Sequence, residues 1–144
     1  MKRQALSLTC LLSLLLVAGS AIAQSGEVRS NVPFDFTVEG KTVPAGAYTI
    51  GKLGRSGETL LLGSQDGKMH MVISSNAAQN LAGANKTKLV FNRYKDQYFL
   101  SEIWVQGSTS GRQIPKSKRE KELAKEVALA SVAPERVEIV AALR

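Results

Sequence analysis

The feature that most constrains the fold of this chain is a pair of strand-like segments, residues 87–94 and 98–105, separated by a turn at 95–97. Strict alternation places Leu89, Phe91, Leu100 and Trp104 on one face of the resulting hairpin, and Val90, Phe99, Ile103 and Val105 on the other. A two-residue loop sets Arg93 opposite Tyr98. Because both faces are apolar, we expect a second sheet, a barrel wall or a helix to cover each of them.

Four segments that precede this hairpin are also predicted to be strands, the third from three successive leucines and the others from the alternation of half-buried strands. They are residues 32–38, 47–53, 58–63 and 68–74. Asp66-Gly67 lies between the last two segments and predicts a type I′ hairpin turn, because both residues tolerate a positive φ. Residues 75–86 are small and polar with little periodicity, so we interpret them as a long loop.

The pattern changes after residue 106. The stretch 107–116 is rich in Gly and Ser at its start and predicts a flexible linker. Ser117 and Glu120 form a capping-box sequence before apolar residues at helical spacing, so we expect an amphipathic helix over 117–133 that Pro134 ends. Residues 134–144 alternate again and predict either a tail or a final strand.

Together these segments predict a mainly β fold. We expect a small antiparallel β-barrel or β-sandwich over residues 31–106, with one C-terminal α-helix, and a loose polar segment at 24–30. Strands and helices do not alternate, which argues against a parallel sheet. Without its first 23 residues the chain keeps 121, enough for one domain with a core of its own.

Residues 1–23 have the three parts of a secretory signal peptide. Lys2 and Arg3 supply positive charge, residues 6–17 form an apolar run, and Ala21-Ile22-Ala23 is a small-x-small cleavage sequence. Cleavage between Ala23 and Gln24 is expected. The sequence therefore predicts an exported protein, periplasmic or extracellular.

The composition limits the chemistry of the exported chain. The single cysteine, Cys10, lies in the signal segment, so we expect neither a disulfide nor a cysteine-based metal site. No later apolar run reaches the roughly 18 residues of a membrane-spanning helix, which predicts no transmembrane segment. Loss of Lys2 and Arg3 lowers the formal net charge from +7 to +5. That excess fits either plain solubility or an anionic partner.

Motifs for catalysis are mostly missing from the sequence. His70 is the single histidine and the chain contains no Gly-x-Ser-x-Gly, so a serine triad and a structural zinc site are not expected. Four acidic residues outside the helix remain candidates for a carboxylate pair, with nothing to mark any two as partners: Asp35, Glu58, Asp96 and Glu102. We predict no enzyme activity and no cofactor, with a small carboxylate-dependent hydrolase as the alternative.

Several segments in combination resemble a known family. They are 31–36 (NVPFDF), 43–50 (VPAGAYTI), 91–100 (FNRYKDQYFL), Trp104 and 115–120 (PKSKRE). This combination is similar to a family of small, uncharacterised secreted bacterial proteins, and the resemblance spans residues 28–125. Family members often carry Gly where this chain has Lys95. The resemblance implies export but no activity, cofactor or catalytic residue.

Two groups of residues are candidates for binding. The first joins aromatic rings and a cation near the hairpin tip, a combination that suits sugars or planar anions: Arg93, Tyr94, Tyr98 and Trp104. The second is a basic segment between 112 and 125, with four cations as its candidate contacts: Lys116, Lys118, Arg119 and Lys121. The alternatives are that Trp104 and one tyrosine belong to the core, and that the basic run is a solvated helix face.

The sequence favours an exported, non-catalytic binding module over other classes of function. Its expected contact surface is the 93–98 hairpin tip together with residues 112–121. Candidate partners are anionic polysaccharide, lipid headgroups or an envelope protein; nucleic acid is not expected for an exported chain. A structural subunit of an envelope assembly is a further alternative.

Overall fold

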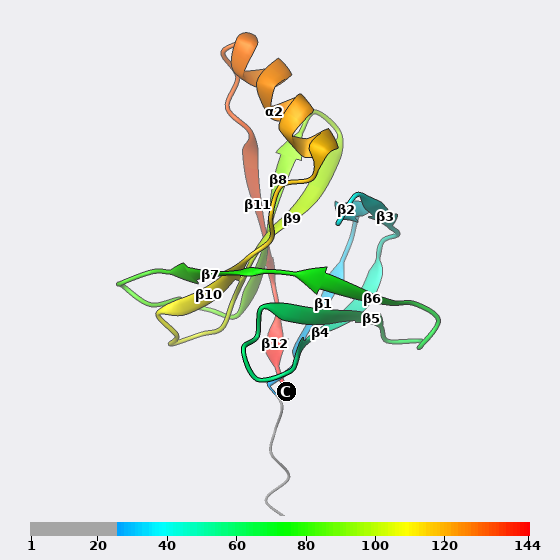
Figure 1. The fold of residues 1–144 in the computed structure, drawn as a ribbon, viewed down its shortest axis with the longest axis vertical. Coiled ribbons are helices and arrows are strands. Elements are labelled where there is room, and N and C mark those ends of the chain that lie inside the picture. Colours follow the sequence, from blue (N-terminus) through cyan, green and yellow to red (C-terminus); the bar gives the residue numbers. More distant parts are fainter. Residues whose placement is uncertain (1–25) are drawn as a thin grey trace, which may run out of the picture.

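A computed structural model of the protein describes residues 26–144. In this part of the chain two β-sheets and one α-helix form a sandwich-like fold, which confirms the mainly β prediction (Figure 1). The two sheets do not close into a barrel, so the structure decides between the two expected architectures. The expected signal segment with Cys10 and the Ala23–Gln24 cleavage site lies outside the described residues.

The first sheet, here called the N-terminal sheet, has the strand order β12-β1-β4-β5-β6. All of its neighbouring strands are antiparallel. Its strands are β1 (Val28–Val32), β4 (Gly46–Leu53), β5 (Thr59–Ser64), β6 (His70–Ser74) and β12 (Ala142–Leu143).

The second sheet, here called the hairpin sheet, is built around β8 and β9 in the order β11-β8-β9-β10-β7. A short hairpin of β2 and β3 joins it through a parallel bridge from β2 to β9. Its strands are β2 (Phe36–Val38), β3 (Lys41–Val43), β7 (Asn76–Gln79), β8 (Lys88–Tyr94), β9 (Gln97–Trp104), β10 (Ser110–Gln113) and β11 (Glu135–Val140).

The β8–β9 hairpin has the predicted two-residue turn, with Arg93 opposite Tyr98. Its predicted faces are wrong beyond Leu100, because a bulge at Ser101 shifts the register by one residue. Ile103, not Trp104, therefore faces the main core with Leu89 and Phe91, and Trp104 packs with Val90 on the other side. The backbone of the bulge is tied down, since the Ser101 carbonyl accepts from Ile114 N at 2.8 Å.

The main core lies between the two sheets, as the double-sided hairpin requires. Three aromatic rings meet there edge to face, because Phe36 contacts Tyr48 and Phe91 at ring-centroid distances of 5.6 and 5.3 Å. The fully or nearly buried aliphatic residues around them come from both sheets and from the segment after β10: Val28, Val32, Val38, Val43, Ile50, Leu60, Leu62, Ile73, Leu89, Leu100, Ile103 and Ile114.

Two segments expected to be irregular are strands. β7 lies inside the expected 75–86 loop and β10 inside the expected 107–116 linker, and these two strands pair with each other. They escaped prediction because strands of small polar residues at or next to a sheet edge bury little on either face and so lack alternation. Gly111 has a packing reason, since a Cβ added there would lie 2.5 Å from the Trp104 ring.

The N-terminal boundary and two turns also differ from expectation. The expected loose segment 24–30 overlaps β1, which begins at Val28 and is paired on both sides. Positive φ at two successive residues, the type I′ signature, occurs at Glu39-Gly40 rather than at Asp66-Gly67. The β5–β6 connection is longer, and the Asp66 carboxylate accepts there from Lys68 N.

The helix α2 (Lys118–Leu129) confirms the predicted start but is shorter than expected. The Ser117 hydroxyl accepts from Glu120 N at 3.2 Å, as a capping residue does. Residues 134–144 form β11 and β12, so the strand alternative holds. These two strands attach the C-terminus to both sheets, because β11 pairs with β8 and β12 with β1.

Lys95, in the turn of the β8–β9 hairpin, has a strained backbone conformation whose cost can be measured. Lys95 has φ 58°, a region that costs an L-residue about 1 kcal/mol and glycine almost nothing. Both Lys95→Gly and Lys95→Ala lose the exposed contact with Glu126, so we expect the glycine variant to be about 1 kcal/mol more stable than the alanine variant. Urea unfolding of the two variants checks this, and equal stabilities would contradict it.

Candidate binding surfaces

Helix α2 covers the outer face of the β8–β9 hairpin near its turn (Figure 1). Leu123 and Val127 from the helix pack on Tyr94 and Phe99 from the hairpin, and all four side chains are buried. The ends of the hairpin and of the helix are further joined by an ion pair between Lys95 and Glu126, with Nζ and Oε2 3.5 Å apart. These contacts place α2 against the hairpin tip, but the helix residues that make them lie beyond 112–121, the segment that the sequence proposed as part of the contact surface.

Glu120 is buried at this contact, with an exposed fraction of 3%. Its Oε1 accepts from Asn92 Nδ2 at 3.1 Å and from the Tyr94 hydroxyl at 3.3 Å. The expected capping box is therefore only half formed, since the Glu120 carboxylate bonds hairpin side chains instead of a backbone N–H of the cap. A buried carboxylate needs such donors, because an ionised group without partners is costly in the interior.

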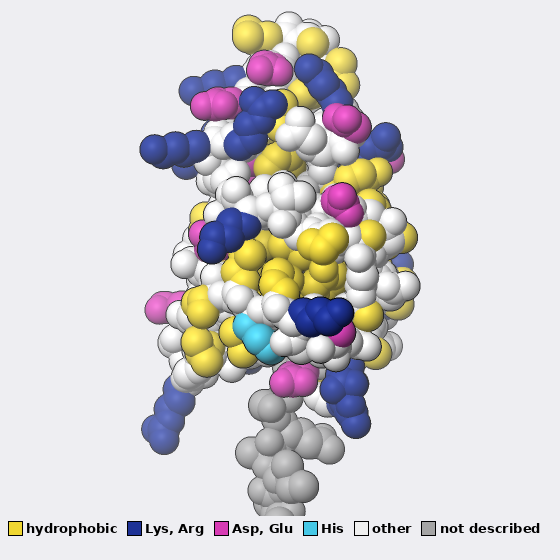
Figure 2. All heavy atoms as spheres, turned by 90° about the vertical axis from the view of Figure 1, so that its right-hand side faces the viewer, with side chains coloured by type: hydrophobic (Ala, Val, Ile, Leu, Met, Phe, Trp, Pro, Cys, Tyr) yellow, Lys and Arg dark blue, Asp and Glu magenta, His cyan; other side chains and the backbone are white. Residues whose placement is uncertain are grey.

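With Glu120 buried, the exposed surface on and before α2 carries five cations against two carboxylates, Glu122 and Glu126. We call this the basic face; its residues are Lys116, Lys118, Arg119, Lys121 and Lys125. Arg119 lies 3.8 Å from Glu122, whereas the four lysines form no ion pair with any residue in the range 26–144. Figure 2 shows Lys and Arg side chains projecting from this end of the molecule, with Asp and Glu side chains among them.

The aromatic residues proposed for ligand stacking lie mostly inside the fold. Tyr94 and Trp104 have exposed fractions of 1% and 7%, which favours the core interpretation for both rings. Tyr98 is half-buried and stacks on Phe34 with ring centroids 3.8 Å apart. Arg93 lies over the Tyr98 ring and pairs with Glu135 at 2.9 Å. The hairpin tip therefore presents little open aromatic surface.

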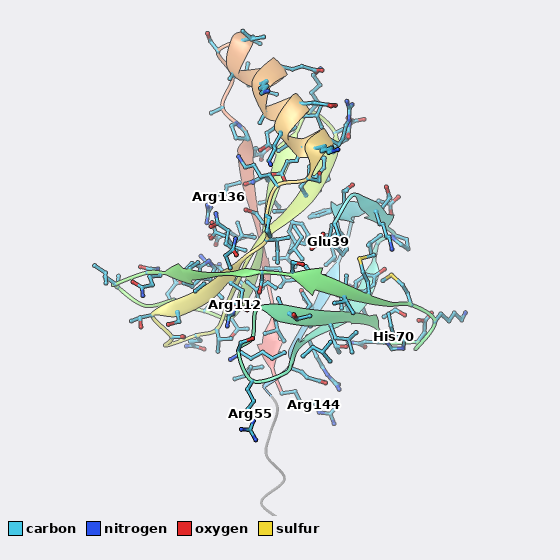
Figure 3. The ribbon with its side chains drawn as sticks, viewed as in Figure 1. Glu39, Arg55, His70, Arg112, Arg136 and Arg144 are labelled. Atoms are coloured by element: carbon cyan, nitrogen blue, oxygen red, sulfur yellow. The ribbon has the colours of Figure 1, made fainter. Side chains whose placement is uncertain are left out.

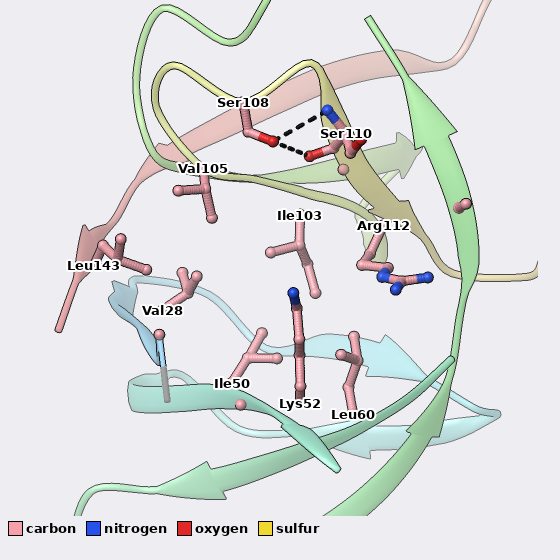
Figure 4. Close-up of a pocket in the computed structure, with 14 residues that line it drawn as sticks. Val28, Ile50, Lys52, Leu60, Ile103, Val105, Ser108, Ser110, Arg112 and Leu143 are labelled. Carbon is pink, nitrogen blue, oxygen red and sulfur yellow. Dashed lines mark hydrogen bonds between the residues drawn. The ribbon is translucent and has the colours of Figure 1, made fainter. Parts of the chain in front are cut away.

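A second candidate site, which the sequence did not indicate, is a cavity of about 490 Å³ between the two sheets. Figure 4 shows Val28, Ile50 and Leu60 on one wall and Ile103 and Val105 on the other. Arg112, expected in the basic segment, lies at this cavity instead and donates to the Ser56 carbonyl at 2.7 Å. The signal is absent from the sequence because the lining comes from six distant segments.

Two of the four candidate acidic residues, Asp35 and Glu102, are engaged in structural contacts. Asp35 caps a turn by accepting from Ala45 N, and Glu102 accepts two bonds from Arg136 and one from Trp104 Nε1. Burial raises the pKa of Glu102, but these bonds outweigh it and lower the pKa. His70 lies on β6, far from Arg136 in Figure 3. Within residues 26–144 no three metal-ligating side chains of the His, Cys, Asp or Glu type cluster together.

Comparison with known proteins adds no assignment, because no family model, curated protein or solved structure matches this chain. In the range 26–144, no helix combines the length and apolar character needed to cross a bilayer.

The Tyr94–Glu120 contact predicts a loss of stability at high pH. Burial first, and then the charge of Glu120, raises the pKa of Tyr94 from 10.0 to about 12. The folded state therefore keeps this proton where the unfolded chain has released it, so stability is complete below pH 10 and falls as the pH rises toward 12. We expect Tyr94→Phe to reduce the fall in unfolding free energy between about pH 9 and about pH 11.5.

Urea unfolding at the two pH values measures this effect. Burial also raises the pKa of Tyr48, so the variant should keep part of the fall. Tyr98→Phe, which removes a half-buried phenol and leaves Tyr94 in place, is the matched control. An undiminished fall in Tyr94→Phe would show that this hydroxyl does not contribute.

Proposed function

We propose that this protein is an exported, non-catalytic binding module whose basic face holds it on an anionic surface of the cell envelope. The observation that carries the proposal is the charge imbalance of that face. Among the described residues its four lysines form no ion pair, although Glu122 and Glu126 are exposed on the same helix, and Glu120 is turned into the core. Unpaired surface cations attract anionic polymers and lipid headgroups.

The end of α2 favours lipid headgroups as the first partner. Lys121, Lys125 and Leu129 follow one another at four-residue spacing, so they lie in one row along the helix. Leu129 and Val132 have exposed fractions of 89% and 59%. Apolar side chains beside cations are typical of segments that rest in the headgroup region of an anionic membrane.

The alternatives have weaker support. Of the four candidate carboxylates for a hydrolase, Asp35 and Glu102 are committed to hydrogen bonds with other groups of the described structure. A role as an assembly subunit would use the outer face of the N-terminal sheet, where Leu61 and Val72 are exposed. Anionic polysaccharide is an alternative to lipid headgroups as the partner, because it carries the same sign of charge.

The test is vesicle sedimentation with purified residues 24–144, which include the whole described fold. We expect binding to vesicles with anionic phospholipid, release at high salt, and little binding to zwitterionic vesicles. Replacing Lys116, Lys118, Arg119 and Lys121 by Glu should weaken binding at least tenfold, since each cation near the surface contributes about 1 kcal/mol. The melting temperature should change little, because all four side chains are exposed.

A matched control carries four charge reversals elsewhere, at Lys41, Arg55, Lys68 and Arg144, which are exposed and lie outside the basic face. Equal weakening in both variants would mean that only net charge matters and would contradict a specific face. Binding to an anionic polysaccharide resin but not to vesicles would replace the lipid by a polymer. A lack of binding to both would reject the proposal.

A further inference from the structure

The cavity between the sheets is a separate site from the basic face. We propose that it binds a single-chain aliphatic molecule with an anionic head group, such as a fatty acid. Its lining comes from β1, β4, β5, β7, β9, β10 and β12 and from the loop before β10, and it includes no residue of α2. At about 490 Å³ it falls within the range of small-molecule sites, roughly 300–1,000 Å³.

The walls of the cavity are suited to an aliphatic chain. The side chains that face each other across it are aliphatic: Val28, Ile50, Leu60, Ile103, Val105 and Leu143 (Figure 4). No aromatic residue lines it, so stacking on a flat ring is not what this site offers. Displacement of water from apolar surface of this kind by a hydrocarbon chain lowers the free energy and so favours binding.

Neutral polar groups of the lining already have hydrogen-bond partners within the protein. The Ser108 hydroxyl donates to the Ser110 carbonyl at 2.8 Å and accepts from Ser110 N at 3.1 Å, so these groups satisfy one another. A sugar would bring many hydroxyls to a site that has few unpaired donors and acceptors for them. The lining therefore disfavours a carbohydrate.

Two cations supply the recognition of charge. Lys52 and Arg112 are the charged residues of the lining, which contains no acidic residue. Figure 4 shows Lys52 extending from β4 toward Ile103, and Arg112 standing on β10 beside it. Neither cation forms an ion pair with a carboxylate in residues 26–144. An anionic head group would therefore find two donors beside the aliphatic walls of the cavity.

Isothermal titration calorimetry with dodecanoate, below its critical micelle concentration, tests the proposal. We expect saturable one-to-one binding by purified residues 24–144. Dodecyltrimethylammonium has the same chain with a cationic head, and butyrate has the same head with a short chain, so both should bind far more weakly. Lys52→Gln should weaken dodecanoate binding about tenfold, as loss of one charge-assisted hydrogen bond does.

Three variants keep the result interpretable. Lys41→Gln removes an equivalent exposed charge from β3, outside the cavity, and should bind like the wild type. Ala77→Phe places a ring at the lining from an exposed position on edge strand β7 and should block binding while the fold persists. Arg112→Gln should weaken dodecanoate binding as Lys52→Gln does. If the Arg112→Gln variant unfolds because it loses the contact with Ser56, Lys52→Gln alone tests the role of the cations.

The outcomes separate this site from the proposed function. Dodecanoate binding that survives both Lys52→Gln and Ala77→Phe would overturn the proposal, as would equal affinity for the cationic amphiphile. The basic-face variant, with Lys116, Lys118, Arg119 and Lys121 reversed, should bind dodecanoate normally even if it no longer binds vesicles. Loss of dodecanoate binding in that variant alone would place the ligand at α2 and reject the cavity.

Discussion

The structure depends on burial of the β8–β9 hairpin from both sides. One face packs against the N-terminal sheet through Phe91 and Leu100, and the other packs against α2 through Tyr94 and Phe99. No cysteine lies in the described residues, so packing and hydrogen bonds must hold these layers together. The C-terminal strands reinforce the arrangement, because β11 extends the hairpin sheet and β12 closes on β1. The positions of the helix and the N-terminal sheet thus follow from the need to cover both apolar faces of one hairpin.

The sequence predicted those features that alternation and turn chemistry encode. Strong periodicity located β4, β5, β6, β8 and β9, and Ser117 marked the start of α2. The Ser101 bulge was invisible, because an extra residue in a strand leaves composition unchanged while moving every later side chain to the opposite face. Strands β7 and β10 could not be predicted for a different reason. They are ordered by pairing with a neighbouring strand, and their own residues show no alternation that would indicate this.

The candidate surfaces show the same division between local and long-range information. The cations of the basic face could be found from the sequence, because exposed lysines on an amphipathic helix need no partner to define them. The inward orientation of the Glu120 side chain could not be found from the sequence, because it depends on hydrogen bonds from Asn92 and Tyr94, which are distant in the chain. Counting Glu120 as a surface charge makes the helix look more balanced than it is. Burial of one carboxylate therefore changes the electrostatic character of the whole face.

The bulge at Ser101 also connects the fold to the cavity. Without the extra residue, continued alternation would turn Glu102 and Trp104 toward the N-terminal sheet and Ile103 away from it. An indole ring and a carboxylate would then occupy space that is now lined by Ile103 and Val105 and bordered by Lys52 and Arg112. With the bulge, Trp104 instead packs against Gly111, and Glu102 pairs with Arg136 on the outside. One inserted residue thus makes the inter-sheet space both emptier and more positive, the two properties that an anionic aliphatic ligand requires.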